Sequence, residues 1–257
     1  MSGIHPTAII SPAAELAEDV SVGPYTVIED DVRIGPGTAI ASSCLIASGA
    51  RIGERCVIAH GAVIATQPQD LKFGGEKTFV EIGDGTLIRE YATVNRGTAA
   101  HGTTTVGKGC MLMAYSHVAH DCILGDHVIL ANAVNLAGHV EIDDYVIIGG
   151  IVPVHQFVKI GAHAMIGGGF RVPQDVCPYS LCGGYPLRVM GINAVGLRRR
   201  GFTRDAVAAI EQAFKILFFS KLNTSQALER IRAEMEITPE VGRILEFADR
   251  STRGLTK

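Results

Sequence analysis

The chain has 257 residues and a formal net charge of −3 at pH 7; 47% of its residues are hydrophobic, 30 are glycine and none is tryptophan. This balance argues against nucleic acid as a partner, because nucleic-acid-binding proteins usually carry a basic excess. The segment from Met1 to Ala8 lacks the regions of a signal peptide, and no apolar run reaches the roughly 18 residues of a membrane span. We therefore expect a cytoplasmic protein with no transmembrane segment.

A six-residue period organises the chain from Ile4 to Val172. Every sixth position in this stretch holds Ile, Leu or Val, except at Asp70, Glu76 and Ala100. Glycine or another small residue recurs one position after the aliphatic residue, and small or β-branched residues recur four positions after it. A short fixed period of this kind indicates a solenoid of stacked units. We expect the aliphatic residue to point inward from a short strand and the glycine after it to adopt the positive φ of a corner.

Four of the six cysteines belong to the same pattern. Cys44, Cys56, Cys110 and Cys122 each fall four residues after an aliphatic position, where a free cysteine serves as a compact hydrophobic side chain. The chain has no C-x-x-C pair, so we expect neither a disulfide framework nor a zinc framework.

Two segments interrupt the period. Residues 65–81 and 95–105 are rich in Pro, Gly and polar residues, and the period resumes in phase after each, with twelve and six extra residues respectively. They are predicted to be loop excursions from a corner. A long loop in a compact domain is usually functional or disordered, and we favour a function for the first.

The composition changes after Gln174, where a Pro- and Gly-rich link replaces the period. Apolar residues at helical spacing then predict helices over residues 205–219, 225–235 and 239–247, the last with Thr238 as N-cap and Pro239 at the first helical position. We divide the chain into a solenoid, residues 1–189, and a C-terminal helical module, residues 190–257. A cap on the open end of the solenoid, or an oligomer contact, is the simplest role for this module.

The period resembles that of the hexapeptide-repeat acyltransferases, in which three hexads form one triangular coil of a left-handed parallel β-helix. The resemblance implies an all-β solenoid with an added α-helical module. Counting in eighteens, with both excursions bulging outward, places Ile64, Val118, Leu136 and Val154 in one column. The polar residues that follow this column are His120, Gly138, His139, His155 and Gln156.

Because adjacent coils lie about 4.7–4.9 Å apart, we expect the imidazoles of His120, His139 and His155 to share one cleft beside the first excursion, with His117 next to them. A histidine with a pKa near neutral can act as a general base or bind a metal. Gamma-type carbonic anhydrases use the same coil to hold zinc with three histidines. Here His120, His139 and His155 follow their aliphatic positions by two, three and one residues, respectively. Their imidazoles should therefore point in different directions, so we do not expect them to bind one metal ion. Ordinary structural roles are expected for His5, His60, His101, His127 and His163.

A more specific resemblance rests on the segments PQDLKF, SHVAHDC, LAGHV, VHQFV, IGGGF, GINAVGLRRRGF and STRGL. Together they are similar to the UDP-N-acetylglucosamine O-acyltransferases that begin lipid A synthesis, and the similarity covers nearly the whole chain. It implies a homotrimer that takes a 3-hydroxyacyl chain from acyl carrier protein and needs no cofactor. His120 matches the general base, and the backbone N–H of Gly138 matches the donor to the oxyanion.

Further positions match residues that bind the substrates. Those at the sugar, diphosphate or acyl pantetheine are Asp70, Lys72, His117, His139 and Gln156. Those at the uridine and phosphate end are His155, Asn193, Arg199 and Arg200. Gly168 matches the position that limits acyl length, where a glycine implies a long chain. On charge alone, Arg198 to Arg200 could equally be an ordinary helix start. Asp121 could orient His120, but neighbours on an extended chain face opposite ways.

Several alternatives stay open at this level. Val195 stands where some family members carry a glutamate, and the first excursion could select a 3-amino sugar and hence an amide product. A related enzyme that uses acetyl-CoA is a further alternative. Outside this class, a gamma-type carbonic anhydrase or a non-catalytic scaffold solenoid would have the same repeat.

Overall fold

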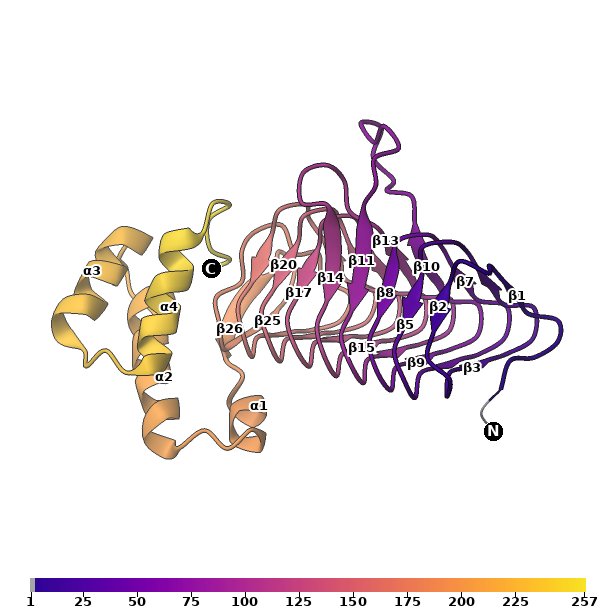
Figure 1. Ribbon diagram of the computed structural model, residues 1–257. Helices are drawn as coiled ribbons and strands as arrows, with labels where there is room; N and C mark the ends of the chain where they lie inside the picture. The colour runs from indigo at the N-terminus through magenta and orange to yellow at the C-terminus, as the bar shows by residue number, and fades with distance from the viewer. Residues whose placement is uncertain (1–2) are drawn as a thin grey trace.

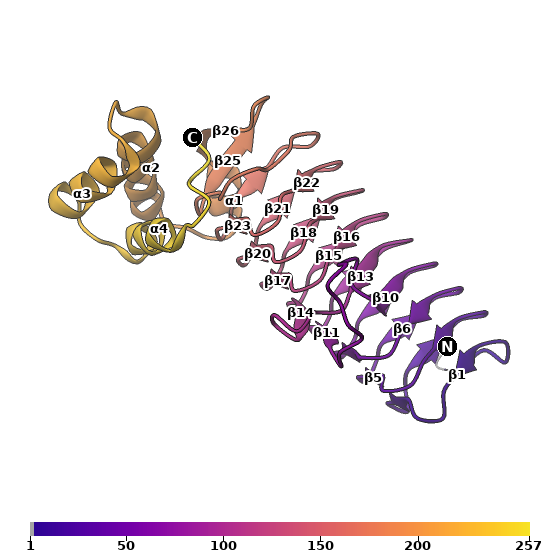
Figure 2. The same cartoon turned by 90° about the horizontal axis from the view of Figure 1, so that it is seen from above.

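The computed structural model describes residues 3–257; Met1 and Ser2, at the start of the predicted solenoid domain, lie outside the described residues. Short strands wind into a triangular coil whose turns stack along one axis, and a group of helices lies at the C-terminal end of the stack (Figure 1). Seen from above, the turns form regular layers from the indigo N-terminal end to the orange helices (Figure 2). The coil is the left-handed parallel β-helix that the resemblance implied.

Three parallel sheets form the faces of the triangle. Sheet I contains β1 (Ile9–Ile10), β4 (Val27–Ile28), β7 (Leu45–Ile46), β10 (Val63–Thr66), β13 (Thr93–Asn95), β16 (His117–Val118), β19 (Asn135–Leu136) and β22 (Pro153–Val154). Sheet II contains β2 (Glu15–Leu16), β5 (Arg33–Ile34), β8 (Ala50–Ile52), β11 (Phe79–Ile82), β14 (Thr103–Val106), β17 (Ile123–Leu124), β20 (Glu141–Ile142) and β23 (Lys159–Ile160). Sheet III contains β3 (Ser21–Val22), β6 (Ala39–Ile40), β9 (Val57–Ile58), β12 (Leu87–Ile88), β15 (Met111–Leu112), β18 (Ile129–Leu130), β21 (Ile147–Ile148), β24 (Met165–Ile166), β25 (Ser180–Gly183) and the antiparallel β26 (Arg188–Ile192).

The register confirms three hexads per coil. Val118 pairs with Leu136, which pairs in turn with Val154, and Ile64 joins the same column through Val94. Both excursions therefore bulge outward without shifting the register, as the counting assumed. The first lies between β10 and β11 and projects from the coil (Figure 1), and the second lies between β13 and β14.

The aliphatic residues of the period fill the inside of the triangle. From Val22 onward they are buried, and the four cysteines four residues beyond an aliphatic position are buried with them. Burial of apolar side chains favours folding by about 1.5–3 kcal/mol each, and a shift by one residue would turn the whole set outward. The inward slots predicted from the sequence are thus confirmed.

The predicted role of the glycines at the corners is wrong. The positive φ lies at the third residue after the aliphatic position, as in Tyr115, Asp121 and His139, and not at the glycine directly after it. The glycines one residue after the aliphatic position permit close approach instead. A Cβ atom on Gly23 would lie 2.7 Å from the backbone carbon of Ala41 in the next coil, and the other glycines in this position, except Gly167, are equally crowded.

The helical module contains one helix more than predicted. The helices are α1 (Ala194–Arg199), α2 (Arg204–Phe219), α3 (Thr224–Glu234) and α4 (Pro239–Arg250). Thr238 caps α4 as expected, with its hydroxyl accepting from the Val241 N–H at 3.4 Å. Arg198 to Arg200 end α1 rather than start a helix, and β26 continues to Ile192, past the expected boundary at 189/190. Within residues 3–257, none of the helices has the length and apolar character needed to cross a membrane.

The chain after α4 returns to the last coil and binds at Asp175. This buried carboxylate accepts hydrogen bonds from the Lys159 N–H at 2.8 Å and the Ser251 hydroxyl at 2.7 Å. Leu255 forms a parallel bridge with Asp175, and the Thr256 N–H donates to the Asp175 carbonyl at 2.7 Å. The tail thereby covers the end of the solenoid.

Candidate active site

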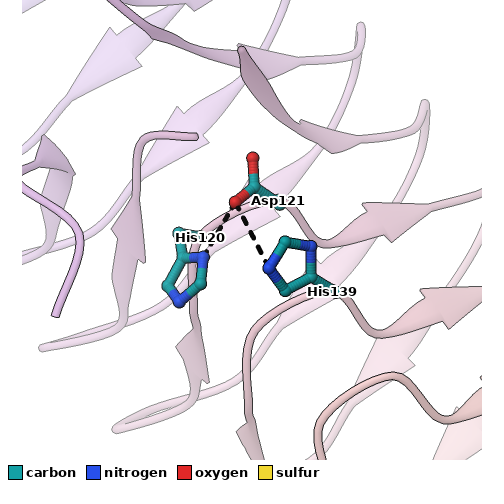
Figure 3. A group of neighbouring side chains, drawn as sticks. All are labelled: His120, Asp121 and His139. Carbon is teal, nitrogen blue, oxygen red and sulfur yellow. Dashed lines mark hydrogen bonds and ion pairs between the residues drawn. The ribbon is translucent and has the colours of Figure 1, made fainter. Parts of the chain in front are cut away.

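The adjacent residues His120 and Asp121 form a hydrogen-bonded pair at the corner after β16 (Figure 3). His120 Nδ1 lies 2.8 Å from Asp121 Oδ2. The expectation that neighbours face opposite ways was wrong here, because Asp121 has φ 60 and the chain is not extended at this point. The left-handed backbone turns the carboxylate back toward the ring that precedes it.

Asp121 is fully buried, and its carboxylate is held from the second excursion. The Thr98 N–H donates to Oδ1 at 2.9 Å, and the Thr98 hydroxyl donates to Oδ2 at 2.7 Å. Burial raises the pKa of Asp121, but the hydrogen bonds from Thr98 and His120 outweigh it and keep this pKa below its usual value. The carboxylate is therefore an ionised acceptor beside the imidazole.

His139 approaches the same carboxylate from the next coil (Figure 3). Its Nε2 lies 3.7 Å from Asp121 Oδ2, and its ring meets that of His120 edge to face with 5.1 Å between centroids. The other side of the ring stacks on Phe157 at 4.7 Å. Burial lowers the pKa of His139, and His120 and His101 lower it further, although Asp121 opposes them. At neutral pH His139 is thus a neutral imidazole packed against the pair.

Gly138 leaves the space that the His120 ring occupies. A Cβ atom at this position would lie 2.6 Å from His120 Nε2, closer than side chains approach each other in proteins. The Gly138 carbonyl accepts from the Phe157 N–H at 3.2 Å, whereas none of the hydrogen bonds recorded within residues 3–257 uses the Gly138 N–H. A free donor and the free Nε2 atom of His120 therefore lie side by side.

This corner opens into a cleft of about 710 Å³. The cleft contains five of the predicted substrate-binding or catalytic side chains and the Gly138 backbone, and it is closed on one side by the tip of the first excursion. The predicted residues that line it are Asp70, Lys72, His117, His120, Gly138 and Gln156. His117 also bonds to the Thr93 hydroxyl at 2.7 Å, and burial followed by the charge of His120 lowers its pKa.

The remaining predicted residues lie outside this cleft. His155 does not join His120 and His139 as expected, because its Nδ1 contacts the carbonyl of Gln156 at 3.0 Å on its own corner. Asn193 is buried as the N-cap of α1, and Arg199 and Arg200 end that helix, with the Arg200 guanidinium 5.1 Å from the centre of the Tyr145 ring. Gly168 lies against the backbone of Gly150: a Cβ atom added to Gly168 would lie 3.1 Å from the Gly150 carbonyl oxygen.

Several residues near the pair were not predicted, among them Thr104, whose hydroxyl accepts from the Asp121 N–H at 2.8 Å. Thr98 holds Asp121, and the His101 ring lies 5.5 Å from that of His139, edge to face. Both belong to the second excursion, where the period is suspended, so the counting that aligned the columns could not place them.

Two imidazoles and a carboxylate are also a possible donor set for a metal. The nearest atoms of His120, Asp121 and His139 lie within 4.8 Å of one another. A tetrahedral zinc ion with ligands at about 2.0–2.2 Å would hold its donor atoms roughly 3.3 Å apart. The separation of 2.8 Å between His120 Nδ1 and Asp121 Oδ2 is that of a hydrogen bond instead. The geometry is better suited to proton transfer than to metal binding.

Comparisons with known proteins identify the family of the chain. A family model described as UDP-N-acetylglucosamine O-acyltransferase, domain 2, matches residues 175–256, and a bacterial transferase hexapeptide model matches residues 31–66 and 103–138. An acyl-[acyl-carrier-protein]–UDP-N-acetylglucosamine O-acyltransferase from Chlorobium phaeobacteroides is 55% identical over 255 residues, which cover 99% of this chain and 97% of the relative.

Solved structures are similar over the same length. The UDP-N-acetylglucosamine acyltransferase of Bacteroides fragilis superposes with a TM-score of 0.97 at 44% identity, covering 98% of this chain and 99% of that one. LpxA from Acinetobacter baumannii gives a TM-score of 0.96 at 41% identity, covering 99% of both chains. This chain therefore belongs to the acyl-[acyl-carrier-protein]–UDP-N-acetylglucosamine O-acyltransferases, built on hexapeptide repeats.

Proposed function

We propose that the protein transfers a 3-hydroxyacyl chain from acyl carrier protein to the 3-hydroxyl of UDP-N-acetylglucosamine, the first step of lipid A biosynthesis, with His120 as general base. The observation that carries this proposal is the His120–Asp121 pair. His120 binds Asp121 through Nδ1, so its Nε2 atom is left to face the cleft beside Gly138. Family membership supplies the substrates, and the geometry supports the chemistry.

The proton can be followed through the reaction. Asp121 accepts from His120 Nδ1–H, which leaves the Nε2 lone pair to take the proton of the sugar hydroxyl as its oxygen attacks the thioester carbonyl. The oxyanion that forms accepts from the Gly138 N–H. When the intermediate collapses, the carbon–sulfur bond breaks, and Nε2–H returns the proton to the leaving thiolate. No cofactor takes part, since acyl carrier protein is itself the donor substrate.

The cleft is suited to the polar part of both substrates. Lys72 and the free donors of Gln156 can contact a diphosphate or an amide. Asp70 accepts from the Lys72 N–H at 3.0 Å, which fixes the turn that carries Asp70 and Lys72. We assign Asp70, Lys72, His117, His139 and Gln156 to the sugar, diphosphate and pantetheine. His155, Asn193, Arg199 and Arg200 are assigned to the uridine and phosphate end, and Gly168 to the far end of a long acyl chain.

We further propose a homotrimer, which the distribution of outward-facing residues supports. Within the parallel strands β1 to β24 of the described residues, sheets I and III carry no Asp, Glu, Lys or Arg at the outward position one before each aliphatic residue of the period, whereas sheet II is mostly charged there. The outward residues of sheet II are Glu15, Arg33, Arg51, Glu81, Thr105, Ile123, Glu141 and Lys159. Three triangular prisms can bury two faces each against their neighbours, so sheets I and III would face other subunits and sheet II the solvent.

The corner between sheets III and I supports the same orientation. It exposes Tyr25, Tyr91, Tyr115 and Ile151, which are 44–72% accessible in the single chain. Placed at a three-fold axis, this edge would be covered by its copies. The cleft at His120 opens on sheet I, so sheet III of a neighbouring subunit would complete it and bring residues that the single chain leaves outside.

We also place the enzyme in the cytoplasm. The six free, buried thiols support this location, because reducing compartments preserve thiols.

A direct assay tests the proposal. The purified protein is incubated with acyl carrier thioesters of several lengths and either UDP-N-acetylglucosamine or its 3-amino analogue, and products are read by mass spectrometry. We expect an O-acylated UDP-sugar carrying a long 3-hydroxyacyl chain. Transfer only to the amino sugar, transfer only from acetyl-CoA, hydration of carbon dioxide, or no turnover would favour one of the alternatives instead. Transfer only of ten-carbon chains would contradict the assignment of Gly168.

A further inference from the structure

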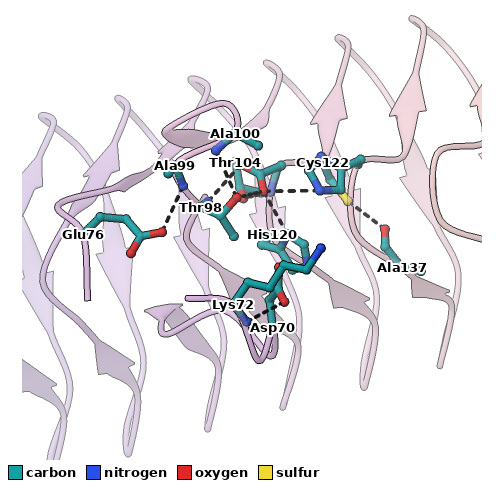
Figure 4. Close-up of polar contacts among 12 residues, drawn as sticks. Asp70, Lys72, Glu76, Thr98, Ala99, Ala100, Thr104, His120, Cys122 and Ala137 are labelled. Atoms are coloured by element: carbon teal, nitrogen blue, oxygen red, sulfur yellow. Dashed lines mark hydrogen bonds and ion pairs between the residues drawn. The ribbon is translucent and has the colours of Figure 1, made fainter. Parts of the chain in front are cut away.

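We propose that residues 96–102, the part of the second excursion that lies between β13 and β14, form a positioning element of the active site in which Thr98 fixes Asp121 as the acceptor for His120 Nδ1. This inference rests on the proposed transferase function and adds to it a residue that does not touch substrate. Thr98 is itself buried, at 7% exposure, between the loop and the corner that carries Asp121. Figure 4 shows it above His120, on the loop that leaves the coil.

The direction of the Thr98 hydrogen bond follows from its neighbours. The Ala100 N–H donates to Thr98 Oγ at 3.2 Å, so this oxygen already accepts one bond (Figure 4). The single hydroxyl hydrogen is left for Asp121 Oδ2, at 2.7 Å. The Thr98 N–H occupies Oδ1 at 2.9 Å, so one residue donates to both carboxylate oxygens.

These bonds determine which nitrogen of His120 carries the proton. The Thr98 Oγ–H and N–H both donate to the Asp121 carboxylate, which is therefore an acceptor. Its contact with His120 Nδ1 then requires that Nδ1 carry the hydrogen. His120 must therefore carry its proton on Nδ1 and present a lone pair at Nε2, which is the form that a general base needs. Without the hydroxyl, Asp121 loses a bond that favours its charged form.

The loop that presents Thr98 is fastened on both sides. The Gly102 N–H donates to the Thr98 carbonyl at 2.7 Å, and the Phe79 N–H donates to the Gly102 carbonyl at 2.8 Å. From the first excursion, Glu76 Oε1 accepts from the Ala99 N–H at 3.1 Å (Figure 4). The segment that carries Asp70 and Lys72 is thus tied to the residue next to Thr98, so the two excursions are held as one unit over the pair.

The test compares Thr98→Val, Thr98→Ala and Thr98→Ser in the full-length protein. Val and Ala remove the hydroxyl and should lower kcat roughly 10- to 100-fold, because a misplaced base costs turnover. The KM for the UDP-sugar should stay within about 2-fold, and Ser should restore kcat to near wild type. Thr105→Val, which removes an outward hydroxyl on β14 of sheet II, is the matched control and should leave both constants unchanged.

A pH profile separates positioning from a structural role. Asp121 should protonate at higher pH in Thr98→Val, so the acid limb of kcat should move upward in pH while that of Thr105→Val stays in place. The titratable groups that face Asp121 are His120, His139 and the buried thiol of Cys122, with His101 and Asp70 beside His139. Double variants with His101→Gln should show the same shift, since His101 does not contact the carboxylate.

Imidazole ¹⁵N NMR of the wild type gives an answer that depends on no variant. We expect His120 to be protonated at Nδ1 at pH 8; a proton on Nε2 would overturn the inference. Wild-type kcat and pH profile in folded Thr98→Val and Thr98→Ala would also overturn it, while leaving the transferase function intact. Absence of turnover in the wild type would count against the transferase function itself, and the NMR result would still decide the role of Thr98.

Discussion

His120 and Asp121 are adjacent in sequence, and their side chains meet at 2.8 Å because Asp121 takes a left-handed backbone conformation. The contact is local, yet its partners come from elsewhere, with Thr98 from a loop and His139 from the next coil. A base and its orienting carboxylate thus occupy a single corner of the coil, and the predictions below test what each part contributes.

Replacing the base should abolish most turnover. His120→Ala is expected to lower kcat about 10²–10⁴-fold with folding unchanged, because it removes the proton acceptor. Mass-spectrometric assay and far-UV circular dichroism check the two halves of this statement. His127→Ala changes an exposed histidine that stacks on Tyr145 and serves as the control. A scaffold protein would show no difference between the two variants.

Asp121→Asn should lower kcat by about 10²-fold or more with little change in KM, because an amide can hold His120 in the wrong tautomer. Steady-state kinetics over pH 5–9 measures both effects. The exposed carboxylate of Asp19 provides a control, Asp19→Asn, that should behave as wild type. Equal loss in both variants would mean that charge in general, and not this contact, matters.

Gly138→Ala should impair catalysis more than folding. The added Cβ would lie 2.6 Å from His120 Nε2 and must displace the ring, so we expect at least a 10-fold fall in kcat, since misplacement of a base by about 1 Å can cost 10²-fold. Gly242→Ala in α4 is a matched control whose Cβ meets nothing closer than 3.8 Å. That change should keep activity and raise stability by up to about 1 kcal/mol. A fully active Gly138→Ala would show that the corner is not crowded.

Stability should fall in acid because of His163. This buried ring stacks between Tyr145 and Tyr179, and burial together with the cations Arg200 and Arg243 lowers its pKa to about 4. Its folded pKa lies below the unfolded value of about 6.5, so the stabilisation is complete above pH 6.5 and is lost as pH falls toward 4.

Urea unfolding at pH 7.5 and 4.5 measures this loss. His163→Phe keeps an aromatic ring that does not titrate, and it should lose less stability between the two pH values than wild type, by on the order of 1–2 kcal/mol. His127→Phe, at an exposed ring of the same stack, should retain the wild-type pH dependence. If His163→Phe were as acid-sensitive as wild type, other groups would have to account for the effect.

The exposed corner between sheets III and I should control assembly. Tyr115→Asp places a charge at the proposed three-fold axis, so we expect a lower molar mass by light scattering and a parallel loss of activity. Thr105→Asp on sheet II, which would face solvent, should leave both unchanged. A fully active monomer of Tyr115→Asp would mean that one subunit contains a complete site.

The sequence predicted whatever depends on the period. The column that aligns Val118 with Leu136 and the inward cysteines followed from counting, because in-register pairing leaves the coil no other way to bury its aliphatic residues. Contacts that depend on backbone conformation at a corner were missed. Asp121 was expected to face away from His120. The glycines after the aliphatic positions were expected to adopt a positive φ, whereas they permit close approach between coils.

Loops outside the period were beyond this counting as well. The ring of His101 contacts His139 in place of the expected His155, and Thr98 reaches Asp121 across the fold. Neither position carries a spacing signal, since both depend on how a loop folds back over the coil. The resemblance identified residues of the cleft, but it did not distinguish those that one chain brings together from those that it leaves apart.

The C-terminal tail has a consequence for the length of the particle. A repeat that stacks through backbone hydrogen bonds has no intrinsic stop, and a bare last turn would offer its edge to another molecule. Leu255 takes that place beside Asp175, and the Ser251 hydroxyl secures it. The last residues of the chain therefore occupy an edge that would otherwise be open to end-to-end stacking. Removing them should produce filaments and leave the chemistry at His120, more than 130 residues earlier in the chain, unchanged.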